Sequence, residues 1–400
     1  MLKRLKNTFL FFMCVVGMGS CTHDIQEKPA GLNTELEVGA QRHEIYLPLL
    51  QGKRIAVIAN ATSMIGDMHL VDALLEKDMD VVKVFAPEHG FRGDKDAGEK
   101  IDDEIDTRTG LPIISLYGAH KKPSVKTMQD IDVLVFDIQD VGVRFYTYLS
   151  TLHYVMEACA ENSVPLILLD RPNPNGFYID GPVLKPEFSS FIGLHPVPLV
   201  YGMTIGEYGR MINGENWLKG GVKCDLTVIK IAGYTHDTLY ELPIKPSPNL
   251  PNMNSIYLYP SLALFEGTLV SVGRGTDFPF QALGHPDYIK GGFQFTPLPN
   301  AGAQYPKLNG RLCKGYDLRA SAANPSPPAR VSLDWLIDFY AVLPNQGNFF
   351  LENNFFNKLA GNDVLMRQIK EGKTQDGIRE SWQDDLKTFK QIRQNYLLYD

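Results

Sequence analysis

Four short runs of carboxylates, arginines and amides hold the side chains of this sequence that could do chemistry. Each run follows an apolar stretch that predicts a β-strand, and the runs cover residues 60–63, 87–93, 137–144 and 170–176. Ligands of parallel α/β sheets bind beyond the carboxyl ends of the strands, so the four runs predict one polar crevice. The inventory suits a sugar, because carboxylates and amides bond its hydroxyls and aromatic rings cover its apolar face.

Glu88 is the first candidate for a catalytic acid. It follows an apolar strand, and Pro87 and Gly90 restrain the backbone around it. Hydrolysis of a glycosidic bond needs a proton donor at the leaving oxygen, usually a carboxylic acid of raised pKa. The alternative is a structural Glu88 that caps a helix or pairs with Arg92. His89 would either contact the ligand or orient Glu88.

Metal and cofactor chemistry find little support in the motifs. Asp137, Asp140 and Asp170 could hold Mg²⁺ or Ca²⁺ through oxygen ligands, but Arg144 and Arg171 lie beside them and would neutralise the same carboxylates. The sequence contains no GxGxxG after the first strand, no Walker A loop, no GxSxG elbow and no HExxH. We therefore predict no metal and no cofactor.

The elements that must position these runs predict an α/β fold. Apolar stretches predict five strands, at residues 55–59, 81–86, 112–116, 131–138 and 165–169. The periodicity of apolar residues between them predicts two long helices, at 67–77 and 145–162. Strands that are apolar throughout are usually buried on both faces, as in parallel sheets.

The second half differs in character and predicts a smaller, mixed α+β part. Proline and asparagine recur from 243 to 260, and β character is expected over 262–273 and 305–319. The last residues read as helices, the longest at 376–397. We place the boundary near residue 240, which gives parts at 41–240 and 241–400.

Composition excludes several classes of protein. The chain has 400 residues, 44% hydrophobic and 21% charged, which argues against a disordered chain, a collagen or a multi-span membrane protein. The formal charge of −7 gives no basic excess for nucleic acid. Five cysteines without metal-ligand spacing suggest neither a disulfide scaffold nor zinc. The oligomeric state stays open.

The first twenty residues predict a signal peptide. A basic start and a short apolar run lead through Gly19 and Ser20 to Cys21, as at a lipoprotein processing site. Lipid on Cys21 would anchor the protein in the cell envelope, facing the periplasm or at the outer membrane, without spanning the membrane. The alternative is an ordinary cleaved signal. Residues 21–40 are polar and resemble a flexible tether.

Five separated motifs occur in the order of one family pattern: PEHGFRG at 87–93, DVGVRFYTY at 140–148, DRPNPNG at 170–176, PSPNLP at 246–251 and EGTLVSVGRGT at 266–276. The sequence resembles the exo-β-N-acetylmuramidases of the NamZ type, once called DUF1343, over residues 40–400. The resemblance implies a hydrolase that removes β-1,4-linked N-acetylmuramic acid from the non-reducing ends of peptidoglycan fragments. It also implies a Rossmann-like domain, a second subdomain and an active-site cleft between them.

The resemblance extends the candidate site into the second half. Glu266 becomes a second candidate carboxylate, with a salt bridge to Arg274 as the alternative. N-acetylmuramic acid carries a lactyl carboxylate, which calls for a cation, and arginine offers a bidentate fork. The candidate substrate-binding residues are Asn60, His89, Arg92, Arg144, Tyr146, Arg171, Asn173, Asn249 and Arg274.

In the expected mechanism Glu88 protonates the leaving oxygen, and a second group activates water or stabilises the oxocarbenium-like transition state. Glu266, Asp137 and Asp140 compete for that second role. Retention, inversion and assistance by the 2-acetamido group all stay open. Two other hypotheses are kept: a glycan-binding envelope lipoprotein without turnover, and a metal-assisted hydrolase of another substrate.

Overall fold

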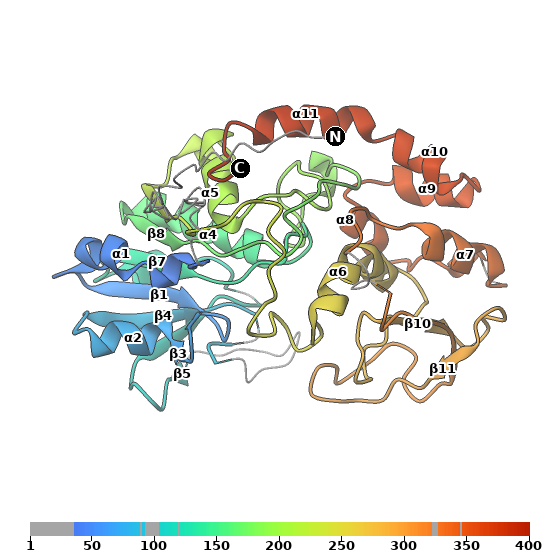
Figure 1. The fold of residues 1–400 in the computed structure, drawn as a ribbon, viewed down its shortest axis with the longest axis horizontal. Coiled ribbons are helices and arrows are strands. Elements are labelled where there is room, and N and C mark those ends of the chain that lie inside the picture. Colours follow the sequence, from blue (N-terminus) through green and yellow to red (C-terminus); the bar gives the residue numbers. More distant parts are fainter. Residues whose placement is uncertain (1–35, 89, 93–103, 119, 322–326, 345) are drawn as a thin grey trace, which may run out of the picture. The chain divides into compact units, whose positions relative to one another are not determined.

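The larger layer of the fold is a seven-stranded sheet in the order β5-β6-β4-β1-β7-β8-β9, shown in the computed structural model of Figure 1. Its parallel strands are β1 (Ile55–Ala59), β4 (Val81–Ala86), β6 (Pro112–Ser115), β7 (Val133–Asp137), β8 (Leu166–Leu169) and β9 (Leu226–Ile229). Only β5 (Glu104–Ile105), at one edge, runs antiparallel. The predicted α/β class is confirmed.

The structure describes residues 36–88, 90–92, 104–118, 120–321, 327–344 and 346–400. The predicted signal peptide, the lipidation site Cys21, most of the predicted tether and His89 lie outside these ranges. Residues 35–400 form one unit. None of the described helices is both long and apolar enough to span a bilayer.

Helices cover both faces of the large sheet. Alternate residues of β1 point to opposite sides, so that Ala56 and Ile58 join one core and Val57 the other. The second core is covered by α1 (His43–Leu50) and α2 (Leu70–Glu76). The first is covered by α3 (Val125–Met128), α4 (Tyr148–Asn162) and α5 (Ile205–Gly214). Both faces of the strands are therefore buried, which explains their unbroken apolar sequences.

The second half adds a small antiparallel sheet and a set of helices. The sheet has the order β10-β12-β11, with β10 (Ala282–His285), β11 (Phe293–Phe295) and β12 (Cys313–Asp317). The helices are α6 (Met253–Leu262), α7 (Asp334–Val342), α8 (Phe355–Ala360), α9 (Val364–Lys370), α10 (Gln375–Glu380) and α11 (Gln383–Arg393). The main core continues from α4 into α6 and α7, so one apolar interior serves both halves. The boundary near residue 240 stays a prediction.

Three local predictions differ from the structure. The helix predicted over 67–77 begins only at Leu70, because β2 (Met64–Ile65) and β3 (Met68–His69) form a hairpin first. Residues 262–273 do not form a regular strand, and the 3₁₀ helix η4 (Ala263–Gly267) begins this segment. The long helix predicted over 376–397 is interrupted between α10 and α11. The remaining 3₁₀ turns among the described residues are η1 (Gly39–Gln41), η2 (Pro186–Phe188), η3 (Lys219–Gly221) and η5 (Gln346–Asn348).

Candidate active site

Glu88 lies just beyond the carboxyl end of β4, and hydroxyl groups from two neighbouring elements hold its carboxylate. The Tyr117 hydroxyl donates to Oε1 at 3.1 Å, and the Thr147 hydroxyl donates to Oε2 at 3.2 Å. Tyr117 follows β6, the strand beside β4, and Thr147 is the residue before α4. Burial and the charge of Glu88 raise the pKa of Tyr117, so its hydroxyl remains a donor at neutral pH. The half-buried carboxylate is thus fixed but not enclosed.

A cavity of about 490 Å³ opens beside Glu88. It is lined by Asn60, Ala61, Thr62, Tyr148 and residues 243–248, a volume within the range of small-ligand sites. The Tyr148 hydroxyl accepts a bond of 2.8 Å from Asn60 Nδ2 and lies 3.4 Å from the carbonyl oxygen of Glu88. The cavity is therefore next to the candidate acid.

Two of the predicted substrate-binding residues lie near this cavity but are not among the residues that line it. Tyr146 is buried, and its hydroxyl donates to the carbonyl of Pro246 at 2.5 Å. Its neighbour Tyr148 is the tyrosine that lines the cavity. Asn249, one residue beyond the lining, donates through Nδ2 to the carbonyl of Gly302 at 2.6 Å.

The second half contributes a carboxylate–guanidinium pair to the same place. Arg274 Nε donates to Glu266 Oε1 at 2.8 Å, and the two side chains are 28% and 23% exposed. Burial raises the pKa of Tyr259, the charges of Glu266, Glu88 and Asp140 raise it further, and Arg274 opposes them. All four charged groups therefore act electrostatically on one buried ring. An active site between the two halves stays a prediction.

Asp140 is buried. Its Oδ2 accepts bonds from the N–H of Gly142 at 2.7 Å and from the Tyr201 hydroxyl. Burial raises the pKa of Asp140 to about 6, although these two bonds oppose the shift. Gly142 has φ 77°, and a Cβ there would lie 2.1 Å from Asn173 Oδ1. The turn that presents Asp140 therefore requires glycine.

Asp137 and Arg171 neutralise each other inside the protein. Arg171 Nε and Nη2 donate to the two oxygens of Asp137 at 2.6 and 2.8 Å. Their side chains are 0% and 3% exposed, and Arg171 also donates to the carbonyl of Met64 at 3.0 Å. A buried bidentate pair joins the ends of β7 and β8, so we leave both residues out of the proposed catalytic set.

Three other candidates are also occupied by the protein itself. Buried Arg144 donates to the carbonyls of three distant segments, at Pro182, Val197 and Leu359. Arg92 pairs with Asp106 and Asp72, not with Glu88. Buried Asn173 donates to the carbonyl of Met203 at 2.8 Å and accepts from the N–H of Asn175. These contacts stabilise the loops around the site, and we assign no ligand contact to these residues.

Sequence reasoning missed Tyr117, Thr147 and Tyr259, and of the two tyrosines that follow Arg144 it favoured Tyr146 for the cleft, whereas Tyr148 lines the cavity. Tyr117 was within reach of the rule that located the other loops, because it follows a strand of the same parallel sheet. Thr147 and Tyr148 stand inside the DVGVRFYTY motif. Tyr259 had no such signal, since it belongs to α6 and reads as a core aromatic.

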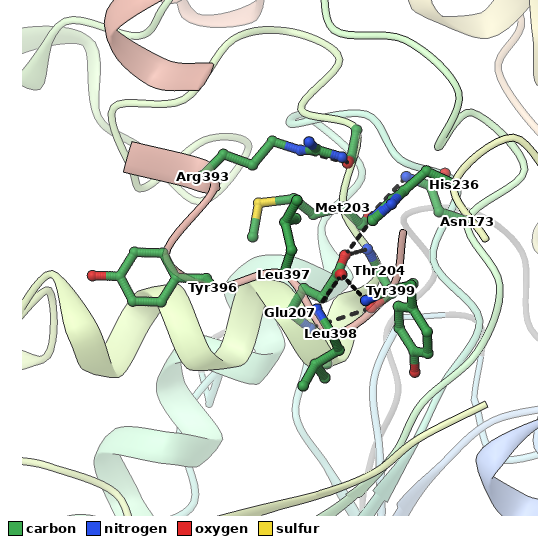
Figure 2. Close-up of polar contacts among 12 residues, drawn as sticks. Asn173, Met203, Thr204, Glu207, His236, Arg393, Tyr396, Leu397, Leu398 and Tyr399 are labelled. Carbon is green, nitrogen blue, oxygen red and sulfur yellow. Dashed lines mark hydrogen bonds and ion pairs between the residues drawn. The ribbon is translucent and has the colours of Figure 1, made fainter. Parts of the chain in front are cut away.

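The described residues contain no group of three or more His, Cys, Asp or Glu side chains arranged to hold a metal ion. A larger cavity, of about 820 Å³, lies under the C-terminus and includes none of the predicted site residues. Its wall contains a polar network around Glu207, shown in Figure 2. Glu207 accepts bonds from the N–H groups of Thr204 and Leu398, at 2.9 and 2.7 Å, and contacts His236 Nε2 at 2.9 Å. This network fastens the end of the chain to α5.

Asp170 lies behind the same C-terminal residues and is completely buried. The hydroxyls of Thr204 and Tyr399 donate to its Oδ2 at 2.7 Å each, and the N–H groups of Arg171 and Gly206 donate to Oδ1. Burial raises the pKa of Asp170 to about 7, although the hydroxyl bonds oppose the shift.

Asp170 therefore predicts a pH-dependent stability. Between about pH 4 and pH 7 the unfolded chain releases a proton that the native state keeps, so the free energy of unfolding falls as the pH rises. Asp170→Asn carries no such proton. As the pH rises from about 4 to about 7, the free energy of unfolding of the variant should increase relative to that of the parent, and above pH 7 the difference should level off. Chemical denaturation at several pH values measures this difference. A pH-independent difference would contradict the prediction.

The fold and the site define a class: an α/β protein whose sheet edge presents a carboxyl group near a small-ligand cavity, as a glycoside hydrolase requires. Sequence models of exo-β-N-acetylmuramidase NamZ match the chain, the N-terminal model at residues 55–254 and the C-terminal model at 257–399. The chain belongs to the NamZ family of exo-β-N-acetylmuramidases, also known as DUF1343.

Relatives support the same assignment. The peptidoglycan β-N-acetylmuramidase NamZ of Bacillus subtilis (strain 168) is 38% identical, over 88% of this chain and 89% of that protein. A DUF1343 family protein of Bacteroides fragilis NCTC 9343 has a solved structure with a TM-score of 0.85 and 46% identity, covering 92% of this chain and 99% of its own. The solved structure of a second DUF1343 family protein from that strain has a TM-score of 0.79 and 29% sequence identity, covering 91% of this chain and 99% of its own.

Proposed function

We propose that this protein is an exo-acting glycoside hydrolase that releases β-1,4-linked N-acetylmuramic acid from the non-reducing ends of peptidoglycan fragments. The observation that carries the proposal is Glu88, a half-buried carboxyl group held by two hydroxyls beside a cavity of about 490 Å³. The 38% identity to the B. subtilis peptidoglycan β-N-acetylmuramidase supports the substrate class.

Glu88 serves as the proton donor to the leaving oxygen. Its backbone follows a strand of the rigid sheet, and the hydroxyls of Tyr117 and Thr147 restrict the rotation of its carboxyl group. A preorganised acid loses little entropy as the proton moves.

Glu266 is the second carboxyl group of this mechanism. Of the three competitors, Asp137 is consumed in a buried ion pair, and Asp140 is buried and accepts bonds from Gly142 and Tyr201. Glu266 is 23% exposed, and its charge and that of Glu88 both raise the pKa of the buried Tyr259. Its pairing with Arg274 places a positive charge beside the carboxylate that would activate water or stabilise an oxocarbenium-like transition state.

Arg274 is the cation for the lactyl carboxylate. The guanidinium groups of Arg144 and Arg171 are buried and engaged, and Arg92 already faces two aspartates. Arg274 is 28% exposed and gives only its Nε to Glu266 in the bond described above. Its terminal nitrogens can therefore form a fork toward a substrate carboxylate.

The function is tested with two chromogenic substrates that differ only in the lactyl group. The protein should release the chromophore from an aryl β-N-acetylmuramide and leave the matching β-N-acetylglucosaminide almost untouched. The discrimination should reach at least about 10²-fold, since the glucosaminide lacks the carboxylate that the terminal nitrogens of Arg274 would bind. The absence of release from the muramide would overturn the proposal.

We further propose that Cys21 carries a lipid that anchors the enzyme in the cell envelope. The support is the sequence of the first twenty-one residues, in which a basic start and an apolar run end at small residues before Cys21. Metabolic labelling with a fatty acid would attach label to the parent and not to a Cys21→Ala variant; label on both would refute the anchor.

A further inference from the structure

The connection between β11 and β12 is long, ordered and positioned at the candidate site. It spans residues 296–312 and contains no helix or regular strand. The Leu298 N–H donates to the carbonyl of Gly275 at 2.9 Å, and the Gly310 N–H donates to that of Pro297 at 2.8 Å. Loops of this length that are nevertheless fixed are usually functional.

Lys307 fastens the inner side of this loop to the segment that carries Glu266. Its ammonium group donates to the carbonyls of Phe265, Glu266 and Val270 at 3.0, 3.3 and 3.2 Å, and also to that of Thr268. Phe265 and Glu266 belong to the last residues of η4, and Thr268 and Val270 follow it, so the ammonium group lies at the carbonyl end of this helix, which favours a cation. The loop is therefore held against the wall that presents Glu266.

The loop touches two walls of the site. On one side, the ring of Pro306 packs so closely on Gly275, the neighbour of Arg274, that a Cβ there would lie 2.7 Å from it. On the other side, Gly302 accepts the bond from Asn249, which adjoins the lining of the 490 Å³ cavity. A chain that leaves the cavity past Arg274 meets this loop.

The outer side of the loop exposes apolar groups and positive charge. Tyr305 is 94% exposed, Leu298 55% and Leu312 51%, all within one connection. Because Lys307 is bonded inward to four carbonyls, Arg311 is the exposed positive charge of the loop, which contains no acidic residue, in a protein of net charge −7. Clustered exposed apolar side chains mark binding sites, and tyrosine rings cover the apolar faces of sugars. The charge suits a ligand that carries carboxylates.

We propose that residues 296–312 bind the leaving part of the substrate, the amino-sugar chain beyond the scissile bond, with a sugar ring stacked on Tyr305. The inference rests on the proposed function, because exo-cleavage holds the terminal sugar in the cavity and leaves the rest of the chain outside. Tyr305 is then a specificity residue for chain length, and it takes no part in the bond-breaking step.

Tyr305→Ala tests this role without threatening the fold, because the side chain is almost fully exposed. The variant should lose about 3- to 10-fold in kcat/KM on a tetrasaccharide that ends in N-acetylmuramic acid, the range of one stacking contact. On the aryl β-N-acetylmuramide, which lacks further sugars, it should match the parent within about twofold. Tyr305→Phe should retain parental rates, because the ring does the stacking.

Val125→Ala is the matched control, since Val125 is 67% exposed on α3 and outside the loop. It should change neither rate. Equal losses of Tyr305→Ala on both substrates, or no loss on the tetrasaccharide, would overturn the inference. If the parent cleaves neither substrate, the proposed function fails. Calorimetric titration with the tetrasaccharide then still tests the inference, because Tyr305→Ala must weaken its binding by about 3- to 10-fold relative to the parent.

Discussion

Glu88→Gln is expected to lower kcat on the aryl β-N-acetylmuramide by about 10²–10⁴-fold, the usual contribution of a positioned general acid. The amide has the shape of the carboxyl group but no acidic proton to give to the leaving oxygen. KM should change much less than kcat, because the substitution leaves the cavity wall and Arg274 in place. Steady-state kinetics on purified parent and variant measure both constants.

The loss has to be chemical rather than structural. A glutamine carbonyl still accepts a bond from Tyr117 or Thr147, and Glu88 is only half-buried, so the melting temperature should move little. Glu104→Gln is the matched control, because Glu104 is exposed on the edge strand β5. Parental turnover by Glu88→Gln, or an equal loss in Glu104→Gln, would remove Glu88 from the mechanism.

The sheet was predictable because its chemistry is local. β1 and β8 are apolar at every position, all of them buried, and Glu88, Asp137 and Asp170 lie at or just beyond strand ends, where a parallel sheet collects polar residues. The hairpin of β2 and β3 had a signal too. Gly66 adopts φ 58° in the two-residue turn Gly66-Asp67, a pair typical of tight hairpins.

The break between α10 and α11 was harder to see. Ser381 ends α10, and its hydroxyl donates to the carbonyl of Ile378 at 2.6 Å. Such side-chain bonds compete with helix continuation, but serine occurs inside many helices, so the sequence pattern alone continues through it.

The roles of the charged residues depend on partners far away in the sequence. Arg144 donates to the carbonyl of Leu359, and Arg92 forms an ion pair with Asp72. The sequence around either arginine does not predict these contacts. Tyr259 also could not be identified from the sequence, because the four charged side chains that shift its pKa are far apart in the sequence. A sequence can therefore locate the edge of the sheet that carries the site, whereas three-dimensional contacts decide which arginine is free to bind an anion.

Arg171→Met is expected to cost about 3–5 kcal/mol of unfolding free energy, because it leaves the Asp137 carboxylate buried without its partner. Arg54→Met is the control: Arg54 is 43% exposed and pairs with Asp132 and Asp130, and loss of exposed pairs costs about 0–1 kcal/mol. Urea denaturation of both variants gives the comparison. Similar costs would mean that the Asp137–Arg171 pair is not the bond between β7 and β8 that its burial suggests.

The double variant Asp137→Asn/Arg171→Met separates stability from catalysis. Removing both charges leaves no unpaired ion, so the double variant should be more stable than Arg171→Met alone. If Asp137 only positions the strand ends, the folded double variant should keep kcat within about tenfold of the parent. If Asp137 were the second catalytic carboxylate, kcat would fall by about 10² or more even as stability returned. That result would assign the role of second carboxyl group to Asp137 instead of Glu266. The buried Asp137–Arg171 pair would then have to open to the substrate during the reaction.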